Sequence, residues 1–249
     1  MIRARYFATV AIAALASCAH AQETAAPPKW ADTLRAELAK ASIANDAATL
    51  TATRTLADRV ASAFPNDGLI LHYQAFAMYR QAIVMGNSPE AGPLLDRAKD
   101  VFERSLALHP IAETHALLAA IDGQLIARDP SRAMLLGIAA GRSSSAALSM
   151  SPANPRVWLV RGQGSIFTPE EYGGGLKAAK EQLTRAVELF EKDAPKPGEP
   201  TWGKAEAYAW LGQVYEKLGD RTKAADAYKT ALTIAPEYGY AKALAAALK

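Results

Sequence analysis

Three short stretches of this sequence carry residue types that serve nucleotide or nucleophile chemistry in other proteins. Residues 198–204, GEPTWGK, match the GxxxxGK spacing of a phosphate-binding loop, but Ala205 stands where a Ser or Thr would hold magnesium. Gly162–Gly164 begins a dinucleotide-binding pattern that lacks its third glycine. Ser143–Ser145 lack the flanking glycines of a GxSxG nucleophile elbow. Because each motif is incomplete, the sequence predicts neither a nucleotide site nor a hydrolase, and we expect no enzyme.

Residues that bind metals are too sparse to form a site. Beyond the first twenty residues the histidines are His72, His109 and His115, without an HExxH pattern and without a cysteine partner. Cys18 is the only cysteine, and it lies close to the start of the chain. We therefore expect no metal, no cofactor and no disulfide.

Two polar features leave alternatives open. Gly173–Gly175 stands before a helical stretch with two lysines, so it is either a backbone nest for an anion or a tight turn between helices. Arg161 stands at the position that Leu211 occupies in the most regular of the repeated units described below, where an apolar, buried side chain is expected. A buried guanidinium needs a partner. That partner is either a carboxylate, from Glu170 or Glu171 in a structural salt bridge, or a group on a bound ligand.

The first residues predict export from the cytoplasm. A basic start, an apolar run over Tyr6–Ala16 and the small residues that follow are typical of a secretory signal peptide over residues 1–21. Ala19–Ala21 fits ordinary cleavage, whereas Leu15–Cys18 resembles a bacterial lipoprotein box, in which Cys18 would carry lipid. We expect a periplasmic protein, anchored to the outer membrane only if Cys18 is lipidated.

Composition favours helices and argues against nucleic acid as a partner. Half of the 249 residues are hydrophobic, alanine is abundant, and no stretch alternates like a strand. The formal charge of +3 falls to +1 without Arg3 and Arg5, since 26 basic residues then face 25 acidic ones. That charge is too small for the electrostatic footprint of a nucleic-acid-binding protein.

Prolines divide the chain into similar units. Pro65, Pro110, Pro152, Pro195 and Pro236 lie 41 to 45 residues apart, and each follows an apolar stretch with helical spacing. The unit over residues 205–238 is the most regular, with small and aromatic residues at fixed offsets: Tyr208, Leu211, Gly212, Tyr215, Ala224, Tyr228, Ala231 and Pro236. Gly212 and Ala224 are small where two antiparallel helices would approach closely.

These offsets resemble those of the tetratricopeptide repeat (TPR) family, of the secreted bacterial type. The resemblance implies an all-α, right-handed solenoid of about five helix-turn-helix repeats. The units are expected at residues 29–65, 66–110, 111–152, 153–195 and 201–236, after a disordered leader over 22–28 and before a capping helix over 238–249. The long repeats and the connector PEEYGGG, residues 169–175, also resemble helical-repeat proteins that accompany tripartite (TRAP-type) transporters.

In that family the first helix of each repeat lines a concave surface that binds partners. Carried onto this chain, the resemblance places there a set of aromatic and polar residues: His72, Phe76, Tyr79, Arg80, Arg156, Gln163, Phe167, Glu206, Gln213 and Glu216. Such a groove suits a protein or peptide partner, and we expect a scaffold or adaptor. Two alternatives stay open: a small-molecule-binding protein that serves a transporter, with Arg161 as a polar anchor, or aromatics that simply pack the solenoid beneath long connectors.

Overall fold

The protein is a stack of antiparallel helices. A computed structural model describes residues 27–248, and the predicted signal peptide, Cys18 and most of the leader lie outside them. Within 27–248 there are eleven α-helices and no strand, which confirms the predicted all-α helical-repeat solenoid. The helices are α1 (Pro27–Ala44), α2 (Ala47–Ala63), α3 (Gly68–Val84), α4 (Ala91–Leu108), α5 (Ala112–Arg128), α6 (Ala133–Met150), α7 (Pro155–Phe167), α8 (Gly175–Phe190), α9 (Lys204–Lys217), α10 (Arg221–Ile234) and α11 (Gly239–Ala247).

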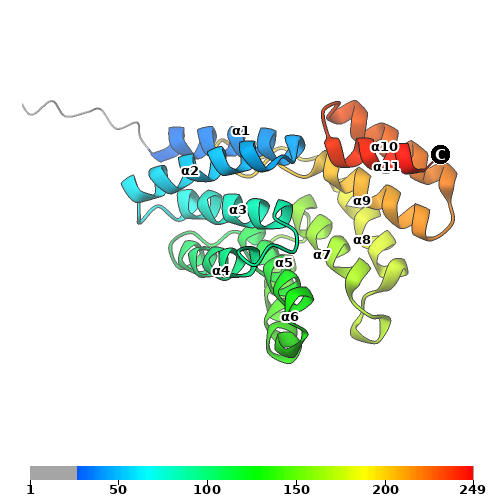
Figure 1. Cartoon of the computed structure of the whole chain (residues 1–249), viewed down its shortest axis with the longest axis horizontal. Coiled ribbons are helices and arrows are strands. Elements are labelled where there is room, and N and C mark those ends of the chain that lie inside the picture. The colour runs from blue at the N-terminus through cyan, green and yellow to red at the C-terminus, as the bar shows by residue number, and fades with distance from the viewer. Residues whose placement is uncertain (1–26, 249) are drawn as a thin grey trace, which may run out of the picture.

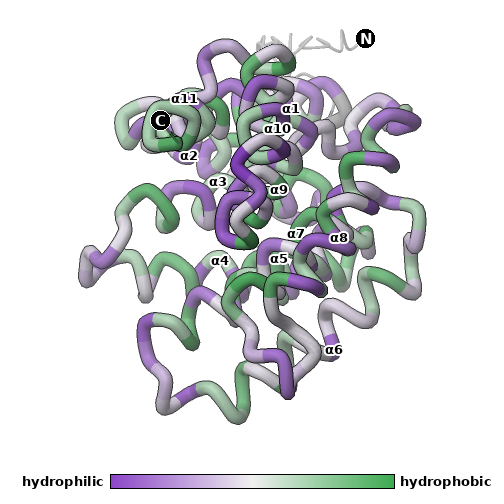
Figure 2. The backbone as a smooth tube through the Cα atoms, turned by 90° about the vertical axis from the view of Figure 1, so that its right-hand side faces the viewer, coloured by the Kyte–Doolittle hydropathy of each residue, from purple (hydrophilic) through white to green (hydrophobic). Residues whose placement is uncertain are grey.

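Consecutive helices pack in pairs, and the pairs stack (Figure 1). The strongest pairings are α3 with α4, α5 with α6, α7 with α8 and α9 with α10. Most of the helices alternate between hydrophobic and hydrophilic residues, as expected where one face is buried (Figure 2). The first helix begins at Pro27, inside the stretch that the sequence assigned to a leader. No helix within residues 27–248 is long and apolar enough to cross a membrane.

Helix ends are set by local chemistry. The Asp67 carboxylate accepts hydrogen bonds from the amides of Leu69 and Ile70, each at 3.0 Å, and so caps α3. Asp220 caps α10 in the same way, after Gly219 has ended α9 with a φ of +83°. Each cap satisfies amides that the first turn of a helix leaves without a partner.

Small residues set the distance between paired helices. A Cβ atom added to Gly212 would lie 2.5 Å from the Tyr228 ring, and one added to Gly162 would lie 2.6 Å from the Leu183 side chain. These distances are too short for any side chain, so α9–α10 and α7–α8 pack closely only because glycine stands there. The close approach predicted at Gly212 is confirmed.

The stack curves until its first and last helices meet. The ends of α1 and α11 lie end to end along one side of the molecule (Figure 1), where Ile43 packs with Tyr238 and Ala241. Beneath them the Arg80 guanidinium on α3 donates to the Glu206 carboxylate on α9 at 2.6 Å and to the Ser42 carbonyl on α1 at 3.1 Å. One side chain therefore joins three helices that are far apart in the sequence.

The segment between α8 and α9, residues 191–203, packs across the inner side of this curve, and we call it the strap. The Tyr73 hydroxyl donates to the Gly198 carbonyl at 2.6 Å, and the Gly198 amide donates to Asp32 at 2.9 Å. The Trp202 ring lies on Phe76 with a centroid distance of 5.1 Å. The long connector thus folds over the inner aromatic residues, which agrees with the alternative that these aromatics pack the solenoid beneath long connectors.

Candidate binding surface

Four of the predicted concave residues form a covered group, and Phe167 is the exposed member of a second group of side chains. The covered group comprises His72, Phe76, Arg156 and Glu206, all of which are buried. Its members lie beneath the strap or at the contact between α3 and α9, which the Arg80–Glu206 ion pair makes and which we call the closure. In this conformation a partner cannot reach these side chains. Their assignment to partner contact stays a prediction, and it requires the strap to move aside.

His72 is a neutral core residue. One ring nitrogen, Nδ1, is 2.8 Å from the Thr114 hydroxyl, and the other has no hydrogen-bond partner within residues 27–248. Burial lowers the pKa of His72 to about 3, with a smaller contribution from His109. The ring packs among Tyr73, Phe76 and Phe102. It carries no charge at neutral pH with which to attract an acidic partner.

The charged members of the covered group are used in internal ion pairs. Arg156 donates to both carboxylate oxygens of Asp193 in the strap, at 3.2 and 2.6 Å, and its guanidinium lies 5.5 Å from the centre of the Phe190 ring. Glu206 is paired with Arg80. Both carboxylates neutralise an arginine inside the protein, so these four charges are paired within the folded chain and are not available to a partner.

Tyr79 lies beside this closure and is only partly exposed. Its ring stacks on Phe76 with a centroid distance of 6.5 Å, and burial raises the pKa of its hydroxyl to about 12. Tyr79 is therefore a neutral hydrogen-bonding group at physiological pH.

The second group is a row of aromatic rings on three successive inner helices. Phe167 at the end of α7 is 73% exposed, and its ring meets Trp210 on α9 edge to face at 6.4 Å. Trp210 in turn lies 5.6 Å from Tyr240 on α11. We call Phe167, Trp210 and Tyr240 the aromatic row. The edge-to-face contact of Phe167 with Trp210 is a favourable geometry, and the Trp210 and Tyr240 rings are tilted at 43°. Phe167 is exposed, whereas Trp210 and Tyr240 are half-buried.

The polar groups beside the row include two glutamines, one tyrosine hydroxyl and one carboxylate. The Gln213 amide donates to the Tyr240 hydroxyl at 2.9 Å, which leaves that hydroxyl free to donate to another acceptor. Burial raises the pKa of Tyr240, so it stays protonated. Gln163 lies on the same stripe of α7 as Phe167, four residues earlier. Glu216 instead accepts a hydrogen bond from Tyr228 on α10 at 2.7 Å.

Two members of the row were absent from the sequence prediction. Trp210 stands four residues after Glu206 and three before Gln213, both of which were predicted, so helical spacing alone could have identified it. Tyr240 belongs to α11, which lies after the last repeat unit. The repeat offsets therefore could not predict which side of α11 faces inward.

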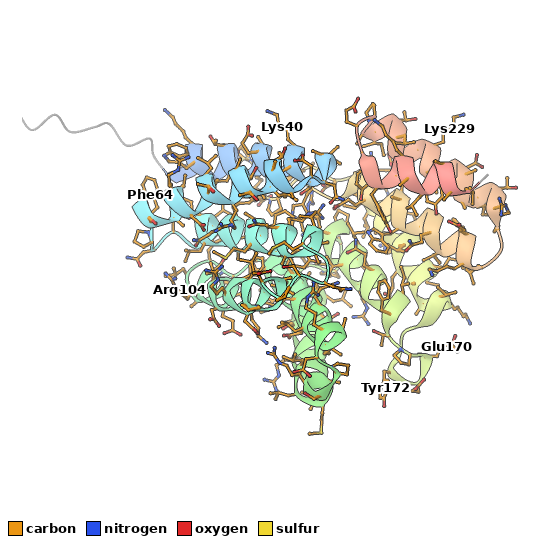
Figure 3. All side chains as sticks on the ribbon, in the orientation of Figure 1. Lys40, Phe64, Arg104, Glu170, Tyr172 and Lys229 are labelled. Atoms are coloured by element: carbon orange, nitrogen blue, oxygen red, sulfur yellow. The ribbon has the colours of Figure 1, made fainter. Side chains whose placement is uncertain are left out.

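Arg161 has a different partner from the predicted one. Its guanidinium donates to the Ser144 hydroxyl on α6 at 3.2 Å. Glu170 and Tyr172 lie at the end of the α7–α8 turn and point away from the helical stack (Figure 3), and Glu171 is also exposed. The predicted bridge to Glu170 or Glu171 was wrong because this turn projects beyond α7 and does not fold back over it.

Gly173–Gly175 forms a tight turn. The amides of the three glycines donate to the carbonyls of Glu170, Pro169 and Thr168 at 2.9 to 3.1 Å. Donors that are already used within the turn cannot cradle an anion, so the turn alternative is confirmed. Within residues 27–248, no group of three His, Cys, Asp or Glu side chains could hold a metal ion.

Comparison with known proteins agrees with this geometry. A model of the tetratricopeptide repeat matches residues 205–238, which are α9, α10 and the turn after them. Residues 205–238 therefore match a tetratricopeptide repeat. A search of curated protein sequences found no match.

Solved structures share the TPR-like fold over most of the chain. TTC0263, a thermophilic TPR protein of Thermus thermophilus, is 18% identical and aligns with a TM-score of 0.64 over 89% of this chain and 98% of its own. The HusA haemophore of Porphyromonas gingivalis is 23% identical, with a TM-score of 0.63 over 79% of this chain and 96% of its own. At these identities the likeness concerns the fold.

Proposed function

We propose that this TPR-like protein is a non-enzymatic scaffold that binds a protein or peptide through the aromatic row on its inner face. The observation that carries the proposal is the continuous contact of Phe167, Trp210 and Tyr240 across α7, α9 and α11, in which Phe167 is exposed and the other two rings are half-buried. Elsewhere on the inner face, the covered group is buried, and its charged members are engaged in internal pairs.

The chemistry of the row favours a neutral, partly apolar segment. Large aromatic side chains dominate binding energy at protein interfaces, and they do so best where the surrounding groups exclude water. The Tyr240 hydroxyl and the Gln163 amide add hydrogen-bonding groups that can meet a peptide backbone. A strongly acidic or basic partner would find no opposite charge among these side chains.

The strap contributes indirectly, because it holds the helices that carry the row. Asp193 fixes α7 through Arg156, and Gly203 packs against Leu159 of α7 and Phe190 of α8. A surface held in its binding conformation loses less entropy on association, which strengthens binding.

We further propose that the protein acts in the periplasm, after removal of residues 1–21, with lipid attachment at Cys18 as the alternative form. Mass spectrometry of the protein from its own host would distinguish the two forms, since a lipidated Cys18 would be the first residue of the mature chain.

Binding of a small flat ligand is the second candidate, because the exposed Phe167 ring and its two aromatic neighbours offer faces on which such a ligand can stack. HusA is described as a haemophore, so haem is the first molecule to test. A haem titration followed by absorbance, together with native mass spectrometry of freshly purified protein, would show a bound small molecule if this candidate holds. A clean apo mass and no haem binding would exclude haem and any retained ligand.

The test of the scaffold proposal is affinity capture from a periplasmic extract with a matched pair of tryptophan variants. Trp210→Ala removes the centre of the row. Trp158→Ala removes a partly exposed tryptophan on α7, whose indole N–H donates to the Pro152 carbonyl at 2.8 Å. We expect the captured protein to be lost with Trp210→Ala and kept with Trp158→Ala. Equal capture by wild type and Trp210→Ala would contradict the proposal.

A further inference from the structure

The helix α6 (Ala133–Met150) is covered on one side only. It packs along α5 but touches α7 at few places, and only Leu136 and Ala147 are fully buried among its eighteen residues. These two residues are eleven positions apart, which is about three turns, so they mark one buried face against α5. In Figure 1, α6 projects from the stack, apart from the α7–α8 turn. The opposite face of α6 therefore has no helix against it.

That outer face is apolar and strongly exposed. Met134 is 83% exposed, Leu135 is 74% and Ile138 is 62%. Contiguous exposed side chains of this size commonly mark an interaction site on a protein that is otherwise well packed. Helical spacing aligns Met134, Ile138, Gly141 and Ser145 in one stripe, opposite Leu136 and Ala147.

The stripe fits a second copy of itself. Its first half carries two large side chains, and its second half carries a glycine and a serine. When two such helices pack antiparallel about the middle of the stripe, Ile138 of each copy lies opposite Gly141 of the other, and Met134 lies opposite Ser145. A Cβ added at Gly141 would meet nothing within 4 Å, so the space above this glycine is open to receive a side chain. Large residues facing small ones interdigitate as packed helices require.

Electrostatics favour the same arrangement. None of the four stripe residues carries a charge, so pairing buries no ionised group. In an antiparallel pair the positive N-terminal end of each helix lies beside the negative C-terminal end of the other, which favours this orientation over a parallel one. Arg142 is exposed beside the stripe.

We propose that α6 is a self-association surface, through which two copies of this chain pair antiparallel about a two-fold axis. An isologous interface of this kind uses the same patch on both subunits. The stripe consists of α6 residues alone, none of which belongs to the aromatic row, so variants of the two surfaces test the two proposals separately.

Sedimentation velocity of the full mature chain across a wide concentration range tests this pairing. We expect a reversible monomer–dimer equilibrium. Ile138→Glu should weaken it at least about a hundredfold, because each copy would bring an unpaired charge into the contact. The matched control is Leu108→Glu, which changes a half-exposed leucine at the end of α4 and should leave the equilibrium unchanged.

A second variant separates the interface from the stability of the fold. Gly141→Leu fills the space that receives Ile138 and should weaken the dimer about tenfold or more. It should not lower the melting temperature of the monomer, because leucine is the better helix former and an added Cβ meets no neighbour at this exposed position. A protein that stays monomeric at every concentration, that binds lipid vesicles through this face instead, or that dimerises equally well as Ile138→Glu would overturn the proposal.

Discussion

Replacement of Trp202 tests whether the strap is an integral part of the fold. The indole is 8% exposed and lies on Phe76 at 5.1 Å. Its N–H is buried without a hydrogen-bond partner within residues 27–248. Trp202→Ala removes a large buried ring and should lower the free energy of unfolding by about 3–5 kcal/mol. Trp202→Phe keeps most of the volume and removes the unpaired N–H, so it should cost under about 1.5 kcal/mol.

The assay is urea unfolding followed by circular dichroism, with the slope of the transition checked for each variant. An unchanged slope shows that both variants expose the same surface on unfolding, so that the midpoints report stability. Trp158→Ala serves as the control, since Trp158 is partly exposed and its loss should cost only about 1 kcal/mol. A cost below about 1 kcal/mol for Trp202→Ala would refute the reasoning, because such a value is typical of a surface side chain.

Three further predictions concern buried groups. Because the folded pKa of His72 is about 3 and the ordinary value is 6.5, its contribution to stability is complete above pH 6.5 and is lost as pH falls toward 3. Urea unfolding at several pH values should show a loss approaching about 1.4 kcal/mol per pH unit that His72→Asn lacks; identical pH profiles would contradict this. Arg156→Ala should cost about 3–5 kcal/mol, since it strands the Asp193 carboxylate, and Arg156→Ala with Asp193→Asn should cost clearly less. An additive double variant would show that the pair does not interact. Gly212→Ala should cost about 1–3 kcal/mol in thermal or urea unfolding, because its Cβ would overlap the Tyr228 ring; a neutral result would mean that α9 and α10 are further apart.

The repeat architecture could be predicted because its determinants are local. Gly212 is small because Tyr228, sixteen residues later, packs onto it, and Asp220 caps the helix that begins at the next residue. Contacts of this kind recur at fixed offsets, so one regular unit was enough to predict the class of the fold.

The covered part of the inner face could not be predicted, because the strap is held by contacts between residues far apart in the chain. Tyr73 and Gly198 are 125 positions apart, and Asp32 and Gly198 are 166 positions apart. No periodic pattern specifies where an extended connector will run, since its path depends on the curvature of the whole stack. The sequence therefore identified Phe76 and Arg156 as inward-facing without indicating that Trp202 and Asp193 would cover them.

Arg161 shows the same limit at shorter range. The repeat register predicted a buried arginine that needs a partner; Arg161 is half-buried, and its partner is the Ser144 hydroxyl. The sequence pointed to the nearest carboxylates along the chain, but the direction of the α7–α8 turn decides whether those carboxylates can reach back. That direction follows from the hydrogen bonds of Gly173–Gly175, which only the structure gives.

The central claim is that partners bind at the aromatic row, and site-specific photo-crosslinking in the native host tests it most directly. A photoreactive phenylalanine analogue would replace Phe167, Trp210 or Tyr240 in turn, with Trp158 as the control position. We predict that the three row positions crosslink to the same partner and that position 158 does not. Crosslinking from position 158 alone, or from none of the row positions while the partner still co-purifies, would contradict the account.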